Sequence, residues 1–283
     1  MITILEIMKS VGELTPLPST APRIAQVISD VNSTVDDVAT VLQYDQALTL
    51  DILKYANSAM SASSRTIATV KDAVVRLGGA RVLERVVARH VKGVMHAPLA
   101  SYGYSERDLW RHSVAAAVAA EQLGALTKSA RAGLSFTAAL LHDIGKLILC
   151  RCAPADDLKK IFCMVFDEPL KLTTEQAEKR ALGFSHADVG AEIASSWKLP
   201  EPIVSAIRNH HSLDNLGEPV TDAVKVANIV ARTIGEGIGN EGMSLAVDSE
   251  LAHRVGLTRD QFEGICMNSS RKLSSVLSMF EMT

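Results

Sequence analysis

An adjacent His142–Asp143 pair lies in an otherwise apolar run, residues 136–149, with Lys146 three positions further on. Burying ionisable groups in such a run is costly unless a partner or a metal ion compensates for the lost hydration. We expect the pair to lie on a central helix, with Ser135 as its N-cap. Taken alone, a His–Asp dipeptide is most often a core histidine beside a capping or salt-bridging aspartate. The positions of the other histidines therefore decide the interpretation.

Further histidines and one amide fall on the apolar stripes of four other predicted helices. These helices span residues 108–122, 185–197, 201–211 and 221–234, and they carry His112, His186, His210 with His211, and Asn228. Neutral imidazoles that converge inside a helical bundle are suited to a metal ion. Nitrogen and carboxylate donors without sulfur favour iron or manganese, or zinc, over copper(I). The alternative is that each histidine is bonded to its own local carbonyl. His90, His96 and His253 lie outside the stripes and are predicted to be surface residues.

Composition limits the classes of partner. A net charge of −3 and an aromatic content of 4% argue against a nucleic-acid-binding surface. Arg76, Arg81, Arg85 and Arg89 share one predicted helix face, which suits a solvated surface as well as a phosphate-binding one.

The location is predicted from three further features. The apolar run is interrupted by ionisable residues, the N-terminus lacks a secretory signal, and the four cysteines have no CxxC spacing. We therefore expect a cytoplasmic protein with reduced thiols and no membrane span.

The fold is predicted to be all-α, a helical bundle in two parts. Helical periodicity dominates, and a hydroxyl followed three positions later by an acid or amide recurs as a helix-start signal. These pairs are Thr34 with Asp37, Ser105 with Asp108, Thr173 with Gln176, Ser185 with Asp188, and Thr258 with Gln261. We expect an N-terminal helical subdomain over residues 1–100 and a second helical unit over 101–283, with a linker near 96–106. No chemistry is assigned to the first unit or to the residues after 235.

The order of the histidines resembles a known metal signature. His112 followed by His142–Asp143 is similar to the start of the metal-binding motif of the HD phosphohydrolase superfamily. Its HD-GYP branch, which degrades cyclic dinucleotides, adds a histidine, a His–His pair and a closing aspartate. The resemblance implies metal ligands at His112, His142, Asp143, His186, His210, His211 and the closing position. It also implies a further ligand at Asp108, for which capping beside Ser105 is the preferred alternative.

Over most of its length, about residues 14–234, the chain resembles the HDOD domain, the HD-related output domain of bacterial signalling proteins. The matching segments are residues 17–18, 45–48, 53–59, 73–78, 109–112, 183–190 and 197–200. This resemblance implies an HD-like core in the second unit, extra C-terminal helices beyond the domain, and a protein partner in a signalling pathway.

Two departures from the enzymes lead to two hypotheses. Asn228 occupies the position of the closing aspartate, although Asp222 competes for that alignment, and no Gly-Tyr-Pro loop follows His211. The first hypothesis is a non-catalytic signalling module that keeps all or part of a divalent metal site. The alternative is an HD-type phosphohydrolase, or phosphodiesterase, acting on a nucleotide or cyclic dinucleotide. In that case Asp143 and Lys146 would be catalytic, with Lys146 neutralising phosphate charge; otherwise Lys146 is a helix-end lysine.

Overall fold

The structure, a computed structural model, describes residues 3–10, 20–30, 32–42, 46–57, 67–127, 129, 131–166, 172–212, 217–237, 239 and 249–281. Helices make up this part of the chain, and within it β-structure is limited to an isolated bridge between Leu99 and Tyr104. The all-α prediction is confirmed. Several predicted features lie outside the described residues, namely residues 14, 17–18, 45, 58–59, 213–216 and 240–242.

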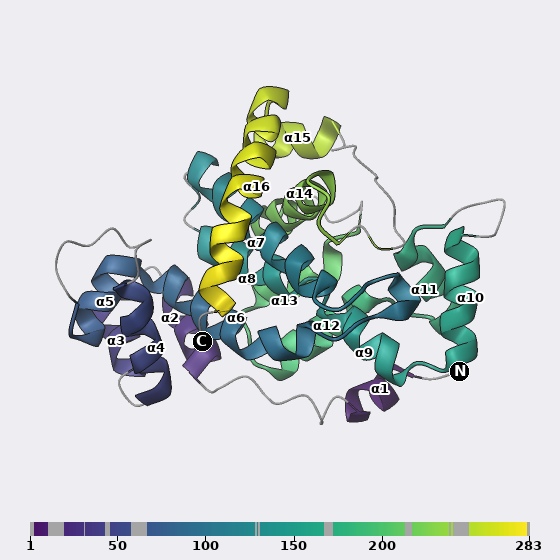
Figure 1. The fold of residues 1–283 in the computed structure, drawn as a ribbon, viewed down its shortest axis with the longest axis horizontal. Coiled ribbons are helices and arrows are strands. Elements are labelled where there is room, and N and C mark those ends of the chain that lie inside the picture. The colour runs from purple at the N-terminus through teal and green to yellow at the C-terminus, as the bar shows by residue number, and fades with distance from the viewer. Residues whose placement is uncertain are drawn as a thin grey trace.

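The helices follow one another along the chain with short connections (Figure 1). In order they are α1 (Ile4–Ser10), α2 (Thr20–Ser29), α3 (Val35–Leu42), α4 (Gln46–Ala56), α5 (Val70–Leu77), α6 (Gly79–Met95), the 3-10 turn η3 (Ala100–Tyr102), α7 (Asp108–Thr127), α8 (Ala132–Leu141), α9 (Ile144–Cys152), α10 (Ala155–Phe166), α11 (Thr174–Leu182), α12 (His186–Ser196), α13 (Glu201–Asn209), α14 (Pro219–Thr233), α15 (Ser249–Val255) and α16 (Arg259–Glu281).

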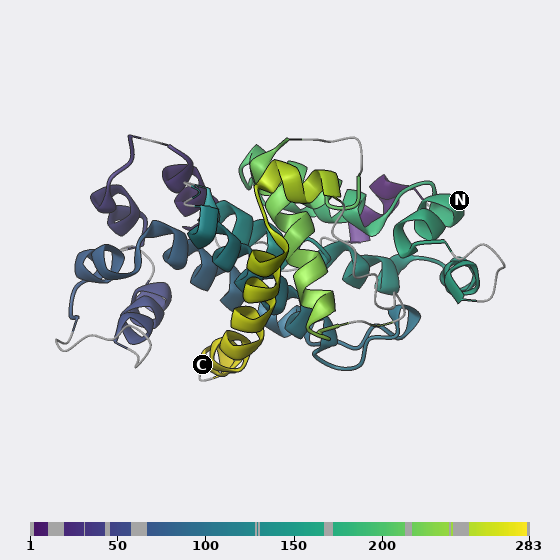
Figure 2. The same cartoon turned by 90° about the horizontal axis from the view of Figure 1, so that it is seen from above.

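Helix α7 is the centre of the molecule. It is buried along most of its length and packs against α8, α14 and α16. Helices α2 to α5 gather at one end and join this core through α6, which packs on α8 (Figures 1 and 2). Helix α1 lies at the other end, against α9 and α12. The division at about residue 100 stays a prediction, since contacts join the two predicted units through both α1 and α6.

Four of the five predicted helix starts are confirmed, whereas the helix after Ser105 begins three residues later, at Asp108. Thr173 and Ser185 each form a complete capping box with the amide or acid three positions on. At the other starts, the acid or amide accepts a hydrogen bond from the backbone N–H of Thr34, Ser105 and Thr258, respectively.

The prediction for the central apolar run is partly wrong. Ser135 is not an N-cap, because α8 begins at Ala132 and the Ser135 hydroxyl donates to the carbonyl of Arg131 within that helix. The run also forms two helices, since His142 and Asp143 occupy a turn between α8 and α9. By length and composition alone, Ala132–Cys152 could cross a membrane, but 94% of its most apolar window is buried inside the protein.

The arginine face and the outlying histidines also differ from expectation. Arg85 is buried and bound to Asp51, and Arg81 contacts Glu121, whereas Arg76 and Arg89 are exposed. Because Arg76 lies on α5 and the others on α6, the four do not share one helix face. His253 is exposed as predicted, whereas His90 and His96 are half-buried. Their rings pack edge-on against Trp197 and Trp110, respectively.

Candidate metal centre

Four chain segments bring these predicted ligands together. His112 lies in the second turn of α7, and His142 and Asp143 form the turn between α8 and α9. His186 is the first residue of α12, while His210 and His211 directly follow α13. Two groups of ligand atoms result, His112, His142 and Asp143, and Asp143, His186, His210 and His211, and within each group all ligand atoms lie within 4.8 Å of one another.

The first group is a nearly equilateral triangle. Its edges are 3.3 Å between Nε2 of His112 and Nε2 of His142, 3.4 Å from His142 Nε2 to Asp143 Oδ2, and 3.5 Å from His112 Nε2 to the same oxygen. Nitrogen and oxygen ligands about 2.0–2.1 Å from one ion in a tetrahedral arrangement lie roughly 3.3 Å apart. The spacing therefore fits three ligands of a single ion.

The second group gathers around the other oxygen of Asp143. Oδ1 lies 3.3 Å from Nε2 of His186 and 3.7 Å from Nε2 of His210. The Nε2 atoms of His186 and His211 are 3.1 Å apart. Asp143 thus faces one ligand group with each carboxylate oxygen.

The proton positions in the first group favour binding of a cation. Nδ1 of His112 is 2.9 Å from the carbonyl of Glu236, and Nδ1 of His142 is 2.6 Å from the carbonyl of Ala139. Carbonyls only accept, so each Nδ1 must carry the single proton of a neutral imidazole. Two Nε2 lone pairs then face each other at 3.3 Å. An ion between them would turn this repulsion into ligation.

Two buried polar atoms support the same conclusion. Asp143 Oδ1 and His210 Nε2 have no hydrogen-bond partner among the described residues, although Asp143 is 1% exposed. Nδ1 of His210 is 2.7 Å from the carbonyl of Ile207, so its Nε2 also presents a lone pair to the cluster. Buried polar atoms without a hydrogen-bond partner are rare in folded proteins, and they lower the stability of the fold unless a ligand binds them. The donor set fits a divalent metal.

A buried lysine shares the carboxylate. The ammonium of Lys146 is 2.8 Å from Asp143 Oδ2 and 3.5 Å from the hydroxyl of Tyr104, and the side chain is 1% exposed. Burial tends to raise the pKa of Asp143, but His142 and Lys146 outweigh it and hold that pKa well below its ordinary value. The carboxylate is therefore ionised and available as a ligand.

Glu178, which sequence reasoning missed, fixes His186. Oε2 of Glu178 accepts from both Nδ1 and the backbone N–H of His186 at 2.7 Å, and Oε1 accepts from the Tyr102 hydroxyl at 2.7 Å. Burial acts to lower the pKa of His186, but the Glu178 carboxylate outweighs it and raises the pKa to about 10. Without a metal, His186 therefore carries a second proton beside His211, and a bound ion would displace that proton.

Two other histidines of the cluster, His142 and His211, are neutral at neutral pH. Burial lowers the pKa of His142 to about 3, and burial with His210 and His186 as neighbours lowers that of His211 well below the ordinary value. Neutral imidazole is the form that binds metal ions.

A glycine permits the two halves of the cluster to approach. A Cβ on Gly145 would lie 1.9 Å from the carbonyl oxygen of His186 and 2.9 Å from the backbone nitrogen of Gly190. Helix α9 therefore packs backbone to backbone on the start of α12. A glycine within an apolar run signals such a close approach, and the sequence analysis did not use it.

Three further candidate ligands lie outside the two ligand groups. The Asp108 carboxylate accepts from the N–H of Ser105 in the turn before α7, as in the capping alternative, but Ser105 is not the N-cap because α7 begins at Asp108; Asp108 belongs to neither ligand group. Asp222, the competitor for the closing position, is bound by Arg254 instead. Asn228 is buried on α14, and its role as a ligand stays a prediction.

Comparison with known proteins decides the family. Residues 14–213 match the HDOD domain. The chain belongs to the HDOD domain family. An HDOD domain protein of unknown function from Geobacter sulfurreducens is 27% identical with a TM-score of 0.68, and the match covers 98% of this chain and 95% of that one.

Two further relatives are longer than this chain. An uncharacterized protein of Treponema pallidum (strain Nichols) is 27% identical over 78% of this HDOD chain but only 43% of its own length. A structure from Marinobacter aquaeolei VT8, named as a proposed signal transduction protein, is 22% identical with a TM-score of 0.75 and covers 97% of this chain and 61% of its own. The chain thus spans less than two thirds of these two relatives.

Proposed function

We propose that this HDOD protein is a non-catalytic regulatory module whose His–Asp cluster holds a divalent metal ion. The observation that carries the proposal is the pair of Nε2 atoms facing each other at 3.3 Å between His112 and His142, because both Nδ1 atoms donate to carbonyls and leave Nε2 lone pairs that one cation can bind together. Nitrogen and carboxylate donors favour iron or manganese, with zinc as a third candidate.

Burial supports a structural or sensory role for the ion rather than catalysis. His112, His142, Asp143, His186 and His210 are at most 4% exposed, and of the cluster only His211 is half-buried. A cyclic dinucleotide would need its phosphate to reach these atoms. A bound ion would instead stabilise the folded state by joining α7, α12 and the α8–α9 turn, since it binds only when these elements meet.

The signalling role rests on the family and on the relatives. The chain matches the HDOD domain, it is similar in fold to one protein named for signal transduction, and two of the relatives carry additional sequence beyond the part that matches. We propose a protein partner in a signalling pathway and a cytoplasmic location. A two-part division near residue 100 would place the metal centre in the second part and leave α2 to α5 as a surface for that partner.

The alternative is a metal-dependent phosphohydrolase acting on a nucleotide or cyclic dinucleotide. One observation favours it: Asp143 faces one ligand group with Oδ2 and the other with Oδ1, as a carboxylate shared by two ions would. Bound metal ions would supply an activated water and neutralise phosphate charge. Asp143 would position the ions, and the Lys146 ammonium would balance charge on the phosphate.

The test measures metal content and hydrolysis on the same preparation. Protein purified anaerobically is analysed by plasma mass spectrometry and incubated with cyclic di-GMP and bis(4-nitrophenyl) phosphate. We expect bound iron or manganese, its loss in Asp143→Ala, its retention in His253→Ala, which alters an exposed histidine, and no hydrolysis. Hydrolysis that Asp143→Ala abolishes would establish the alternative. A folded wild-type protein that takes up no metal, even after incubation with iron, manganese and zinc, would overturn both.

A further inference from the structure

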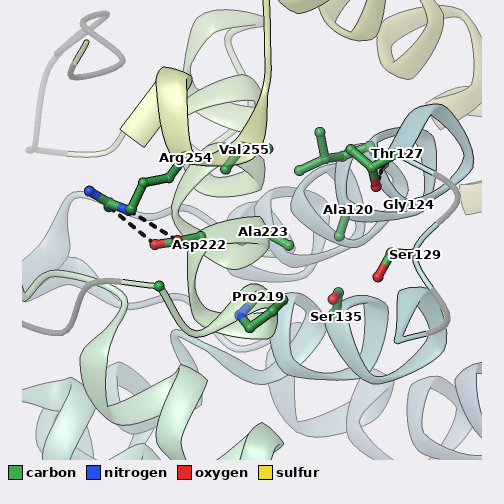
Figure 3. A pocket seen from close by; sticks show the side chains of 12 residues that line it. Ala120, Gly124, Thr127, Ser129, Ser135, Pro219, Asp222, Ala223, Arg254 and Val255 are labelled. Carbon is green, nitrogen blue, oxygen red and sulfur yellow. Dashed lines mark hydrogen bonds and ion pairs between the residues drawn. The ribbon is translucent and has the colours of Figure 1, made fainter. Parts of the chain in front are cut away.

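A cavity of about 440 Å³ lies away from the metal centre, between the C-terminal end of α7, the start of α8, the start of α14 and α15 (Figure 3). Its size is in the range of small-molecule sites in proteins. Apolar side chains, among them Leu123, Ala223 and Val255, form much of its lining. The polar groups divide between its two ends, with hydroxyls at one and an ion pair at the other.

The hydroxyl end presents hydrogen-bond acceptors. Thr127 donates its only hydroxyl proton to the carbonyl of Leu123 at 2.9 Å, and Ser135 donates its own to the carbonyl of Arg131 at 3.2 Å. Both hydroxyl oxygens therefore keep lone pairs and have no further proton to give while these bonds persist. Ser129 at the same end accepts from the N–H of Arg131 at 3.2 Å and keeps its hydroxyl proton, so a ligand here gains from an N–H donor toward Thr127 and Ser135 and an acceptor toward Ser129, as a carboxamide supplies.

The opposite end of the cavity is lined by the ion pair between Asp222 and Arg254. Asp222 accepts from Arg254 at 3.2 and 3.3 Å, and Arg254 also lies 3.2 Å from Glu250. Lys225 is close enough to this pair that its charge interacts with both partners. Asp222 and Arg254 line the cavity and are paired with each other, and Glu250 and Lys225 outside the lining add one charge of each sign, so a charged ligand would meet no excess counter-charge here. The desolvation of a charged ligand would go uncompensated.

We propose that this cavity binds a small uncharged molecule with an apolar, ring-sized body and an N–H donor, such as a carboxamide. The apolar body would contact Leu123, Ala223 and Val255, and the N–H group would donate to Thr127 and Ser135. This site is separate from the metal centre. Ser135 lies on α8 seven residues before His142, which directly follows that helix, so the two residues are about 10 Å apart along the helix axis.

Three probes of similar size separate the ligand classes: benzamide, benzoate and benzylamine, which are neutral, anionic and cationic at pH 7. Binding is measured by ligand-observed NMR and calorimetry in chelator-treated protein, so that the result is independent of the metal centre. We expect benzamide to bind with a dissociation constant on the order of millimolar, as suits so small a ligand, and the two ions to bind at least about fivefold more weakly.

Variants place the binding in the cavity. Thr127→Val and Ser135→Ala each remove one acceptor and are expected to weaken benzamide binding about fivefold. Thr233→Val is the matched control, since Thr233 makes the same bond to the carbonyl four residues earlier, at 2.8 Å, outside the cavity. Ala223→Leu should fill the cavity and abolish binding. Absence of benzamide binding, equal or tighter binding of either ion, or binding unchanged by the cavity variants would overturn the proposal.

Discussion

Asp51 and Asp143 are both almost fully buried, at 2% and 1% exposed, but their surroundings differ. Both oxygens of Asp51 accept from Arg85 at 2.9 Å, through Nε and a terminal nitrogen, and Arg89 lies 3.5 Å from one of them. Asp143 has a single lysine at one oxygen and no aligned donor at the other.

Asp51 is thus a buried charge that stabilises the fold, whereas Asp143 is a buried charge whose surroundings are suited to a bound cation. The guanidinium fork matches a carboxylate and leaves no demand for a further cation. Around Asp143 the Nε2 atoms of His112, His142 and His210 present lone pairs to the cluster, which adds to the demand for a cation instead of meeting it. A buried aspartate without an arginine, surrounded by histidines with acceptor-bonded Nδ1 atoms, is thus a local sign of a metal site.

Removing the arginine should have the largest effect on stability. Arg85→Met leaves the Asp51 carboxylate buried without its fork, and we expect a loss of about 3–5 kcal/mol in the free energy of unfolding. Arg89→Met, at a half-exposed side chain, should lose less than about 1 kcal/mol. Chemical denaturation measures both.

The same variants test whether the two aspartates differ in kind. Metal content per folded chain should stay unchanged in Arg85→Met, because the Asp51 cluster does not contribute to either ligand group. Should Arg85→Met not fold, the double variant Asp51→Leu with Arg85→Met removes the buried charge altogether and should recover much of the stability. A loss of metal in the folded double variant would contradict the contrast between the two sites.

Glu84 is a third buried carboxylate, but unlike Asp51 and Asp143 it is protonated in the folded protein at neutral pH. Burial and the neighbouring Glu121 raise its pKa from 4.5 to about 8, against the opposing effect of Arg81 and Lys272. Because the pKa is higher in the folded state, the stabilisation is complete below about pH 4.5 and is lost as the pH rises through 8. We expect the wild type to lose ~2 kcal/mol between pH 6 and pH 8 from this group.

Substitution of Glu84 should remove that part of the pH dependence. Glu84→Gln is expected to flatten the unfolding free energy between pH 6 and pH 8 relative to the wild type, as followed by denaturation at several pH values. Glu263→Gln, at an exposed glutamate on α16, should leave the slope unchanged. A slope that persists in Glu84→Gln would mean that Glu84 is ionised in the folded protein at neutral pH.

The helical architecture and the order of the ligands were predictable, because local signals specify them. Hydroxyl and acid pairs such as Ser185 with Asp188 determine where helices begin, and the spacing of His112 and His186 places each on an apolar stripe. The turn at His142 was not predictable, since no proline interrupts the apolar run and its one glycine, Gly145, lies within α9 and not at the turn. Contacts across elements, such as Glu178 to His186, depend on how α11 packs beside α12 and leave no periodic signal.

Gly145 tests how closely the cluster depends on backbone packing. Gly145→Ala would place a Cβ 1.9 Å from the His186 carbonyl oxygen, so α9 and α12 must separate. We expect a loss of about 1–3 kcal/mol in unfolding free energy and weaker metal binding, because His186 moves with α12. Gly264→Ala, at a position on α16 with open space around it, should be neutral or slightly stabilising. Equal melting temperatures for the two variants would show that α9 and α12 are not held this closely.

Glu178→Gln should have the smallest effect, because it keeps the shape of the side chain and changes only its charge. The amide can still accept from Nδ1 of His186 and can donate to the Tyr102 hydroxyl, so the fold should persist. Loss of the negative charge makes His186 a poorer ligand, and we expect metal affinity to fall about tenfold, as for other residues that orient metal-binding histidines. Competition with a chelator of known affinity measures this. Glu175→Gln, one turn earlier on α11 and paired with Lys179, is the matched control and should leave the affinity unchanged. Unaltered affinity in Glu178→Gln would mean that Glu178 supports the packing of α11 on α12 without tuning the metal centre.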